Sequence, residues 1–173
     1  MITAIIKSNA MRIIHNRFFP AHPFGLINIL GMVFTQLEPN EVSDKAKRHE
    51  AIHTPQQYEL LTLSAIVSLV MCNIYTSWWY LALLPVVPFA IYALMFIIEL
   101  LIPPYHNAKE CFAGKAWPQI IEAIPTWIGK MWMHAYQDNC FEREAYQNEH
   151  NPDYLVTRPL FGWLRYIIPM RKR

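Results

Sequence analysis

The stretch "LLTLSAIVSLVMCNIYTSWWYLALLPVVPFAIYALMFII" (residues 60–98) contains no Asp, Glu, Lys or Arg. It is too long for one straight crossing, because about 20 apolar residues span the hydrocarbon core of a bilayer. The aromatic residues near its middle, "YTSWWY", suit a turn at the level of the lipid headgroups. We therefore predict two transmembrane helices, over residues 60–76 and 78–102, that form a helical hairpin.

The composition also favours a membrane protein. Apolar residues make up 54% of the 173 residues, and charged residues make up only 16%, against roughly 25% in soluble domains. The six Trp and nine Tyr are typical of long contact with a lipid–water interface. A buried hairpin in a soluble protein is the alternative, but soluble cores rarely contain such an unbroken apolar run. A net charge of +2, with no dense basic patch, argues against a nucleic-acid partner.

The charges that flank the hairpin predict its orientation. Three basic residues precede it within residues 45–48, Lys109 and Lys115 follow it, and the connecting turn has no charge. The positive-inside rule then places both termini in the cytoplasm, in a multi-pass protein of the inner membrane. Because a hairpin returns the chain to its starting side, residues 1–58 and 104–173 can meet.

The whole chain, residues 1–173, reads as one domain in three parts. Residues 24–59 contain an apolar, β-branched stretch around two glycines, which predicts a short strand or hairpin, and then a helix. Residues 60–102 are predicted to form the transmembrane hairpin, and residues 104–173 to form cytoplasmic or interfacial helices. One of these helices is expected to contribute the third ligand of the metal site described next. The predicted fold class is mainly α: an integral membrane helical hairpin plus cytoplasmic helices with a short β element.

The helix before the hairpin contains HEAIH (residues 49–53), an HExxH motif. His49 and His53 are four residues apart, so on a helix both imidazoles lie on one face and can bind one ion. Glu50 then lies beside the metal and can take a proton from water there. Two His and one carboxylate leave a position open on Zn²⁺ for water, as in catalytic sites. The alternative is a solvated helix that contains the motif by chance, and Pro55 would bend or end this helix soon after the ligands.

Carboxylates after the hairpin are the candidates for a third ligand. "FEREAYQNE" (residues 141–149) places Glu142 and Glu149 on one helical face, with Glu144 pointing elsewhere. We expect most carboxylates of this segment to lie on a solvated face. Glu99, near the end of a membrane helix, should either orient a ligand histidine or reach the headgroups, and we favour the second. Five histidines have no partner at ligand spacing and are expected to be interfacial or solvated: His15, His22, His106, His134 and His150.

The order of these segments carries a resemblance. "RHEAIHTPQQYELL", a hydrophobic hairpin and "FEREAYQNEHNPDYLVTRPLFGWLRYI" together resemble small bacterial membrane proteins with HExxH that are usually described as zinc metallopeptidases, from about Phe24 onward. At longer range, HExxH, membrane helices and an E-x-x-x-D helix are similar to the membrane gluzincins. The resemblance implies a gluzincin-like site in which Glu142 is the third zinc ligand. This chain has Tyr146 at the position where the gluzincin pattern has an Asp that supports a histidine. The resemblance also implies that "INILGMVFTQ" (residues 27–36) is an edge strand that binds an extended substrate.

These features predict a membrane-embedded zinc metallopeptidase that hydrolyses amide bonds at the cytoplasmic membrane surface. Glu50 would be catalytic, and His49, His53 and Glu142 would hold Zn²⁺. The expected partners are the lipid bilayer and a peptide or membrane-protein substrate. Two alternatives remain open: a non-catalytic metal-binding membrane scaffold, and a metal-dependent hydrolase of lipid amides or esters, because a site at headgroup level meets lipids first.

Overall fold

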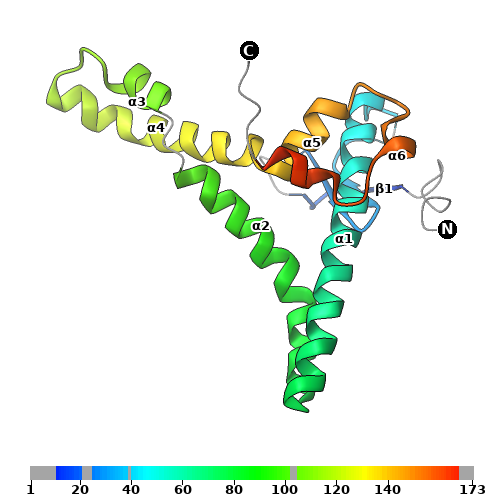
Figure 1. Ribbon diagram of the computed structural model, residues 1–173. Coiled ribbons are helices and arrows are strands. Elements are labelled where there is room, and N and C mark those ends of the chain that lie inside the picture. The colour runs from blue at the N-terminus through cyan, green and yellow to red at the C-terminus, as the bar shows by residue number, and fades with distance from the viewer. Residues whose placement is uncertain (1–10, 21–24, 39, 102–104, 168–173) are drawn as a thin grey trace.

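The computed structural model describes residues 11–20, 25–38, 40–101 and 105–167. The fold is mainly helical, with one small sheet. In Figure 1, α1 (Asp44–Tyr75) and α2 (Leu83–Leu101) form a V that closes at the turn between them. α4 (Trp117–Gln137) extends sideways from the open end of the V, at the level where the sheet packs against α1.

α1 is a single helix of 32 residues, although the sequence predicts two. It begins after Ser43, whose side chain accepts a hydrogen bond from the Ala46 amide, and it ends at Thr76, which has a positive φ of 50°. Of the two outcomes expected at Pro55, a bend or an end of the helix, the end does not occur. Pro55 is buried, and its missing N–H removes one hydrogen bond of the helix. The helical hydrogen bonds resume after it, and α1 continues to Tyr75.

Among the described residues, two helices are long and apolar enough to cross a membrane: α1, and the stretch Trp78–Leu101 formed by the 3₁₀ turn η2 (Trp78–Ala82) and α2. Charges in α1 end at Glu59, so residues 60–75 and 78–101 are the uncharged or nearly uncharged parts of these two candidates. None of the most apolar 18 residues of the second stretch is buried within the protein. Such exposed apolar surface is typical of contact with lipid.

The two membrane-length helices are joined by a hydrogen bond that compensates for a proline. Pro88 has no N–H, so the Leu84 carbonyl lacks its partner within the helix. Ser64 of α1 donates to that carbonyl at 2.8 Å, and it lies 2.9 Å from the Leu83 carbonyl. Ser64 and Ser68 are fully buried, and such small residues let two membrane helices approach closely.

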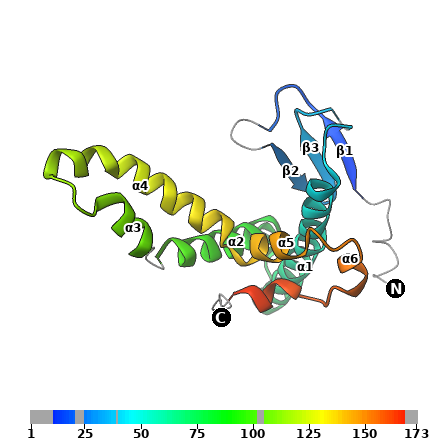
Figure 2. The same cartoon turned by 90° about the horizontal axis from the view of Figure 1, so that it is seen from above.

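The sheet has three strands in the order β1 (Arg12–His15), β3 (Met32–Thr35), β2 (Leu26–Ile29). β2 and β3 form the predicted hairpin, with a tight turn at Leu30 and Gly31, whose φ angles are both positive. β1, which pairs with β3 in parallel, is not anticipated from the sequence. β2 is an edge strand and packs on α1, as Figure 2 shows.

The C-terminal part contains α3 (Tyr105–Phe112), α4, α5 (Cys140–Asn148), α6 (Tyr154–Thr157) and the 3₁₀ turn η3 (Gly162–Tyr166). α5 and η3 pack where α1 and α2 diverge, in a core of Leu60, Cys140, Phe141 and Trp163. The ring of Phe141 stacks on Tyr92 of α2 at 5.8 Å between centroids. This core fixes α5 against the charged half of α1.

Candidate metal centre

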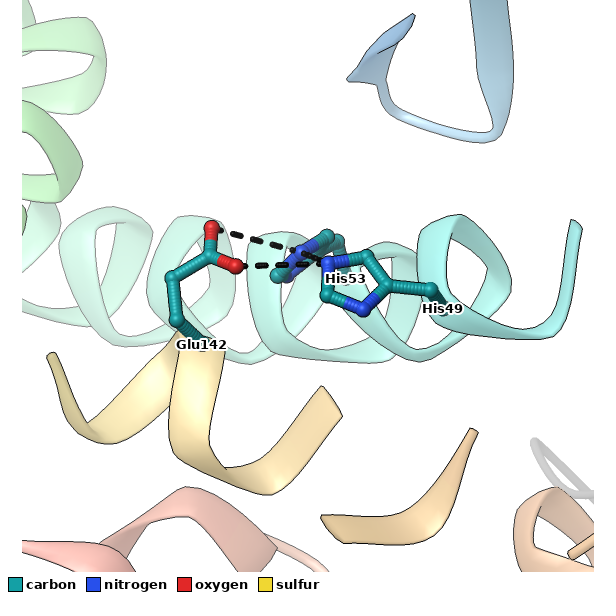
Figure 3. Close-up of side chains that lie close together, drawn as sticks. All are labelled: His49, His53 and Glu142. Atoms are coloured by element: carbon teal, nitrogen blue, oxygen red, sulfur yellow. Dashed lines mark hydrogen bonds and ion pairs between the residues drawn. The ribbon is translucent and has the colours of Figure 1, made fainter. Parts of the chain in front are cut away.

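Three side chains from α1 and α5 converge in the structure: His49, His53 and Glu142 (Figure 3). Each offers one ligand atom, and these atoms all lie within 4.8 Å of one another. His49 Nε2 is 3.2 Å from Glu142 Oε2, and His53 Nε2 is 3.5 Å from Glu142 Oε1. The residues therefore form a group that could hold a metal ion.

The position of Glu142 follows from the start of α5. Asn139 caps this helix by accepting a hydrogen bond from the Phe141 amide at 3.1 Å. Phe141 is held between Tyr92 and Trp163, which fixes the rotation of the first helical turn. Glu142 is therefore directed at α1, and the N-terminal end of the α5 dipole favours its negative charge.

A second carboxylate sets the protonation of His49. Glu149 Oε2 lies 3.0 Å from His49 Nδ1, while its other oxygen pairs with Lys45 at 3.1 Å. The Glu149 carboxylate accepts from Lys45 on one oxygen and has only an acceptor to offer on the other, so Nδ1 of His49 donates. In the neutral ring the proton is then on Nδ1, and Nε2 presents its lone pair to the group. Outer carboxylates orient metal-bound histidines in this way.

An amide sets the protonation of His53. The Gln56 side-chain nitrogen donates to the Phe141 carbonyl at 3.0 Å and to Glu144 Oε2 at 2.8 Å. Since both partners can only accept, the amide oxygen must face the other way, where it lies 2.8 Å from His53 Nδ1. His53 therefore also carries its proton on Nδ1 and directs the lone pair of Nε2 towards His49 and Glu142.

With these tautomers, His49 Nε2, His53 Nε2 and the Glu142 carboxylate face one another as hydrogen-bond acceptors, with no donor among them. The two Nε2 atoms are 3.2 Å apart, and the Glu142 oxygen beside His49 is buried with no hydrogen-bond partner. Two lone pairs at this distance repel each other unless a proton or a metal cation lies between them. The side chains of His49, His53 and Glu142 are only 12%, 14% and 5% exposed, so solvent can compensate little. The residues thus fit a cation bound by two imidazoles and one carboxylate.

The charges of the group shift its pKa values. Burial acts to raise the pKa of Glu142, but when the histidines are protonated, the hydrogen bond that His49 can then donate and the positive charges of His53 and His49 lower it. For His49 burial acts to lower the pKa, but the hydrogen bond and charge of Glu142 favour the protonated ring and raise the pKa above its ordinary value. Burial raises the pKa of Glu50, to which the charge of Glu142 adds, while His53 and His49 oppose the shift.

The carboxylates around the centre are not solvated, contrary to the expectation for most of this segment. Glu144 is fully buried, and Glu149 is only 5% exposed. The sequence points to Glu149 through its spacing of seven residues from Glu142, which is two helical turns, but leaves its role open. Tyr146 places its ring 4.6 Å from that of His49. Glu149 is the carboxylate that contacts His49 Nδ1.

Glu99 does not reach the headgroups, so that expectation is wrong. It is buried, and its Oε1 pairs with Arg143 Nη2 of α5 at 3.0 Å. Of the other histidines, His134 pairs with Asp138 at 3.1 Å. No further histidine joins the metal-binding group among the side chains that the structure describes, which include His15, His134 and His150. His22 and the side chain of His106 lie outside the described residues.

Comparisons with known proteins leave the centre to be interpreted from its own geometry. No protein-family model, curated protein or solved structure matches this chain. What the protein does must therefore be inferred from the donor set, its surroundings and its position relative to the apolar helices.

Proposed function

We propose that this protein is a membrane-embedded zinc metallopeptidase that hydrolyses amide bonds at the cytoplasmic surface of the inner membrane. The observation that carries the proposal is the convergence of both HExxH imidazoles with Glu142, with two Nε2 lone pairs directed inwards. Zinc suits two imidazoles and a carboxylate, and in catalytic sites it keeps one position open. The resemblance to membrane gluzincins, in which Glu142 occupies the third-ligand position, supports the same ion.

Glu50 is the candidate general base. Zinc, when held by these residues, would supply Lewis acidity that acidifies a water molecule and polarises an amide carbonyl. Glu50 follows His49 directly on α1 and interacts electrostatically with His53, His49 and Glu142. Its partly buried carboxylate can accept a proton from the attacking water and pass it to the leaving nitrogen, since burial holds its pKa above the ordinary range.

The edge strand β2 is the candidate peptide-binding element. β2 pairs with β3 on one side, and no strand of the described chain pairs with its other side. The Asn28 side chain donates to the main-chain carbonyl of Glu50 and, at 2.9 Å, to Thr54 Oγ1. This contact holds β2 against the turn of α1 that carries the candidate base. An extended peptide that added to this edge would take the Asn28 carbonyl from Gln57, which donates to it at 2.8 Å, and would run beside the centre.

The apolar surface supports a location at the inner headgroup level. His53 precedes Leu60, the first residue of the membrane segment, by seven residues, which is about 10 Å along a helix. On α4, exposed apolar residues follow one face: Trp117, Ile121, Ile124, Ile128 and Trp132. The ring of Trp132 contacts Phe96 of α2 at 4.8 Å, so this face is turned towards the side from which α2 descends. Such a face suits a helix that lies in the interface.

The test uses purified protein in lipid nanodiscs. Wild type should bind one zinc and cleave a reporter peptide, and Glu50→Gln should keep the zinc while cleavage falls by about 10²-fold or more, because only the proton carrier is lost. Glu122→Gln, an exposed carboxylate on α4, is the matched control and should change neither property. His49→Ala should lose the zinc.

Three outcomes would contradict the proposal. Wild type without zinc would remove the metal centre. Zinc binding without cleavage of any peptide would favour the metal-binding scaffold. Cleavage confined to a panel of lipid amides and esters, and lost in Glu50→Gln, would favour the lipid hydrolase.

A further inference from the structure

A buried charge cluster lies outside the three candidate ligands and joins their two helices. Arg158, in the segment after α6, lies between Glu59 of α1 and Glu144 of α5. Its guanidinium donates to both oxygens of Glu59, at 3.1 Å from Nη2 to Oε2, and to Glu144 Oε1 from Nε at 2.6 Å. The side chains of Arg158, Glu59 and Glu144 are 5%, 6% and 0% exposed. The cluster is therefore desolvated, and each charge depends on its neighbours.

The C-terminal segment is built around the Glu144 carboxylate. Tyr154 donates its hydroxyl to Glu144 Oε1 at 2.8 Å, and the Phe161 amide donates to Glu59 Oε1 at 2.8 Å. At Gly162, a Cβ would lie 2.6 Å from Glu144 Oε1, so a side chain there would displace the carboxylate. Both carboxylates thus hold fixed positions, with their lone pairs directed at specific donors.

The cluster reaches the metal centre through Gln56. The second oxygen of Glu144 accepts the Gln56 amide N–H at 2.8 Å, and Gln56 is only 2% exposed. If the amide flipped, its oxygen would face the Glu144 carboxylate and the Phe141 carbonyl, and three acceptors would meet without a proton. The flip would also turn the NH₂ group towards His53, whose Nδ1 would have to accept. The proton of the neutral ring would then be on Nε2, where it blocks metal binding.

We propose that Glu144, held by Arg158, is a positioning residue that fixes the Gln56 amide and thereby the histidine tautomer in which His53 Nε2 can bind a metal. The acceptor-only carboxylate faces Gln56, the amide oxygen faces His53, and the imidazole must donate from Nδ1. Arg158 pairs with the Glu144 carboxylate and bridges it to α1, which carries both histidine ligands. For its role in metal binding, this inference rests on the proposed zinc site; the tautomer itself does not require a metal.

The decisive experiment reads the tautomer and the metal affinity separately, on the full chain in detergent micelles. The His53 tautomer is measured by ¹⁵N NMR of the metal-free protein at alkaline pH, where the imidazoles are neutral. Zinc affinity is measured by competition with a chromophoric chelator. Gln56→Leu removes the acceptor for Nδ1. Glu144→Gln keeps the shape of the side chain but lets it donate as well as accept, so the amide of Gln56 is free to flip.

In wild type, His53 should be the Nδ1–H tautomer. In Gln56→Leu and Glu144→Gln it should become a mixture, with zinc affinity lower by roughly 10–100-fold, the range that outer hydrogen-bond partners control. The control is Gln57→Leu, because the hydrogen bonds of the Gln57 side chain go to the Asn28 carbonyl and the Leu30 amide of the β2–β3 hairpin, not to either histidine. This control should keep both the tautomer and the affinity.

The outcomes separate this inference from the proposed function. A His53 tautomer that is unchanged in Gln56→Leu and Glu144→Gln would overturn the positioning role, even if zinc binding fell. A tautomer that shifts as expected in a protein that binds no zinc would support the positioning role and overturn the zinc site. If Glu144→Gln fails to fold, Gln56→Leu, which leaves the Arg158 cluster intact, decides alone.

Discussion

The two halves of α1 have opposite relations to their surroundings. In the charged half, up to Glu59, polar groups are buried: Gln56 is 2% exposed and Glu59 is 6% exposed. In the uncharged half, apolar side chains are exposed, with Ile66 at 55%, Leu69 at 63% and Ile74 at 64%. Within one continuous helix, polar side chains near Glu59 are therefore buried, and apolar side chains after Leu60 are exposed.

If residues 60–75 cross a membrane, this contrast explains how the proposed metal centre can lie close to it. Buried charges are stable only where other elements supply partners, and here α5 and the C-terminal segment supply them. Exposed apolar surface of this extent is typical of contact with lipid, and beyond Leu60 many apolar side chains of α1 are exposed. The two halves of α1 can therefore be tested separately, one for contact with lipid and the other for its buried ion-pair partners.

The largest expected effect concerns the exposed half, and it is all-or-none. If residues 60–75 cross the inner membrane, Ser77→Cys should react with a membrane-impermeant maleimide from outside intact cells, in a background where Cys72 is Ser. Tags at both termini should react only after permeabilisation, as the basic flanks predict. Protection of Ser77→Cys in intact cells, or termini on opposite sides, would remove the hairpin and with it this side of the comparison.

The next effect concerns the buried half. Glu59→Leu should destabilise the protein by about 3–5 kcal/mol, because it leaves Arg158 with an incomplete set of buried partners. Leu69→Ala, in the exposed half of the same helix, should change stability by no more than about 0.5 kcal/mol. Unfolding in detergent with increasing denaturant measures both. Equal costs at the two positions would contradict the division of α1 into a protein-packed half and a lipid-facing half.

A smaller but more specific effect concerns the third ligand. Glu142→Ala should weaken zinc binding by more than about 100-fold, beyond the range of an outer hydrogen-bond partner, because it removes an atom of the donor set. Glu149→Ala should weaken zinc binding by only roughly 10–100-fold, since it removes the hydrogen-bond partner of His49 and no ligand atom. Chelator competition gives both numbers. A larger loss in Glu149→Ala than in Glu142→Ala would exchange the two roles.

The smallest effect is a pH dependence. Zinc needs the neutral imidazole, and the negative charge of Glu142 raises the pKa of His49 above its ordinary value of 6.5 in the metal-free protein. Zinc affinity should therefore be highest above this raised pKa, where His49 is neutral. Below it, the affinity should fall by about tenfold per pH unit, because one proton must be released for each zinc bound. Titrations of zinc at several pH values measure the slope. A flat affinity across mildly acidic pH would show that no such proton is displaced.

Local features of the structure could be predicted from the sequence because each depends on neighbours along one helix or hairpin. The apolar run predicted two membrane-length helices, and the glycine-centred stretch predicted a strand or hairpin. Pro55 was misread because a proline removes only one helical hydrogen bond, and the packing of α1 compensates for this loss. β1 was missed because a strand of four residues gains its stability from its partner rather than from its own sequence.

By itself, the sequence determined that His49 and His53 share a helical face and that an uncharged stretch follows them, since both properties depend only on spacing and composition. The tertiary structure decided which carboxylates serve the centre and how. Glu142 and Glu149 face the histidines, and Glu144 faces Gln56, because Phe141 packs against α2 and fixes the rotation of α5. Arg158 reaches Glu59 from 99 residues away. Spacing along the chain cannot specify such contacts, because they form only once the helices pack and water is excluded from their charges.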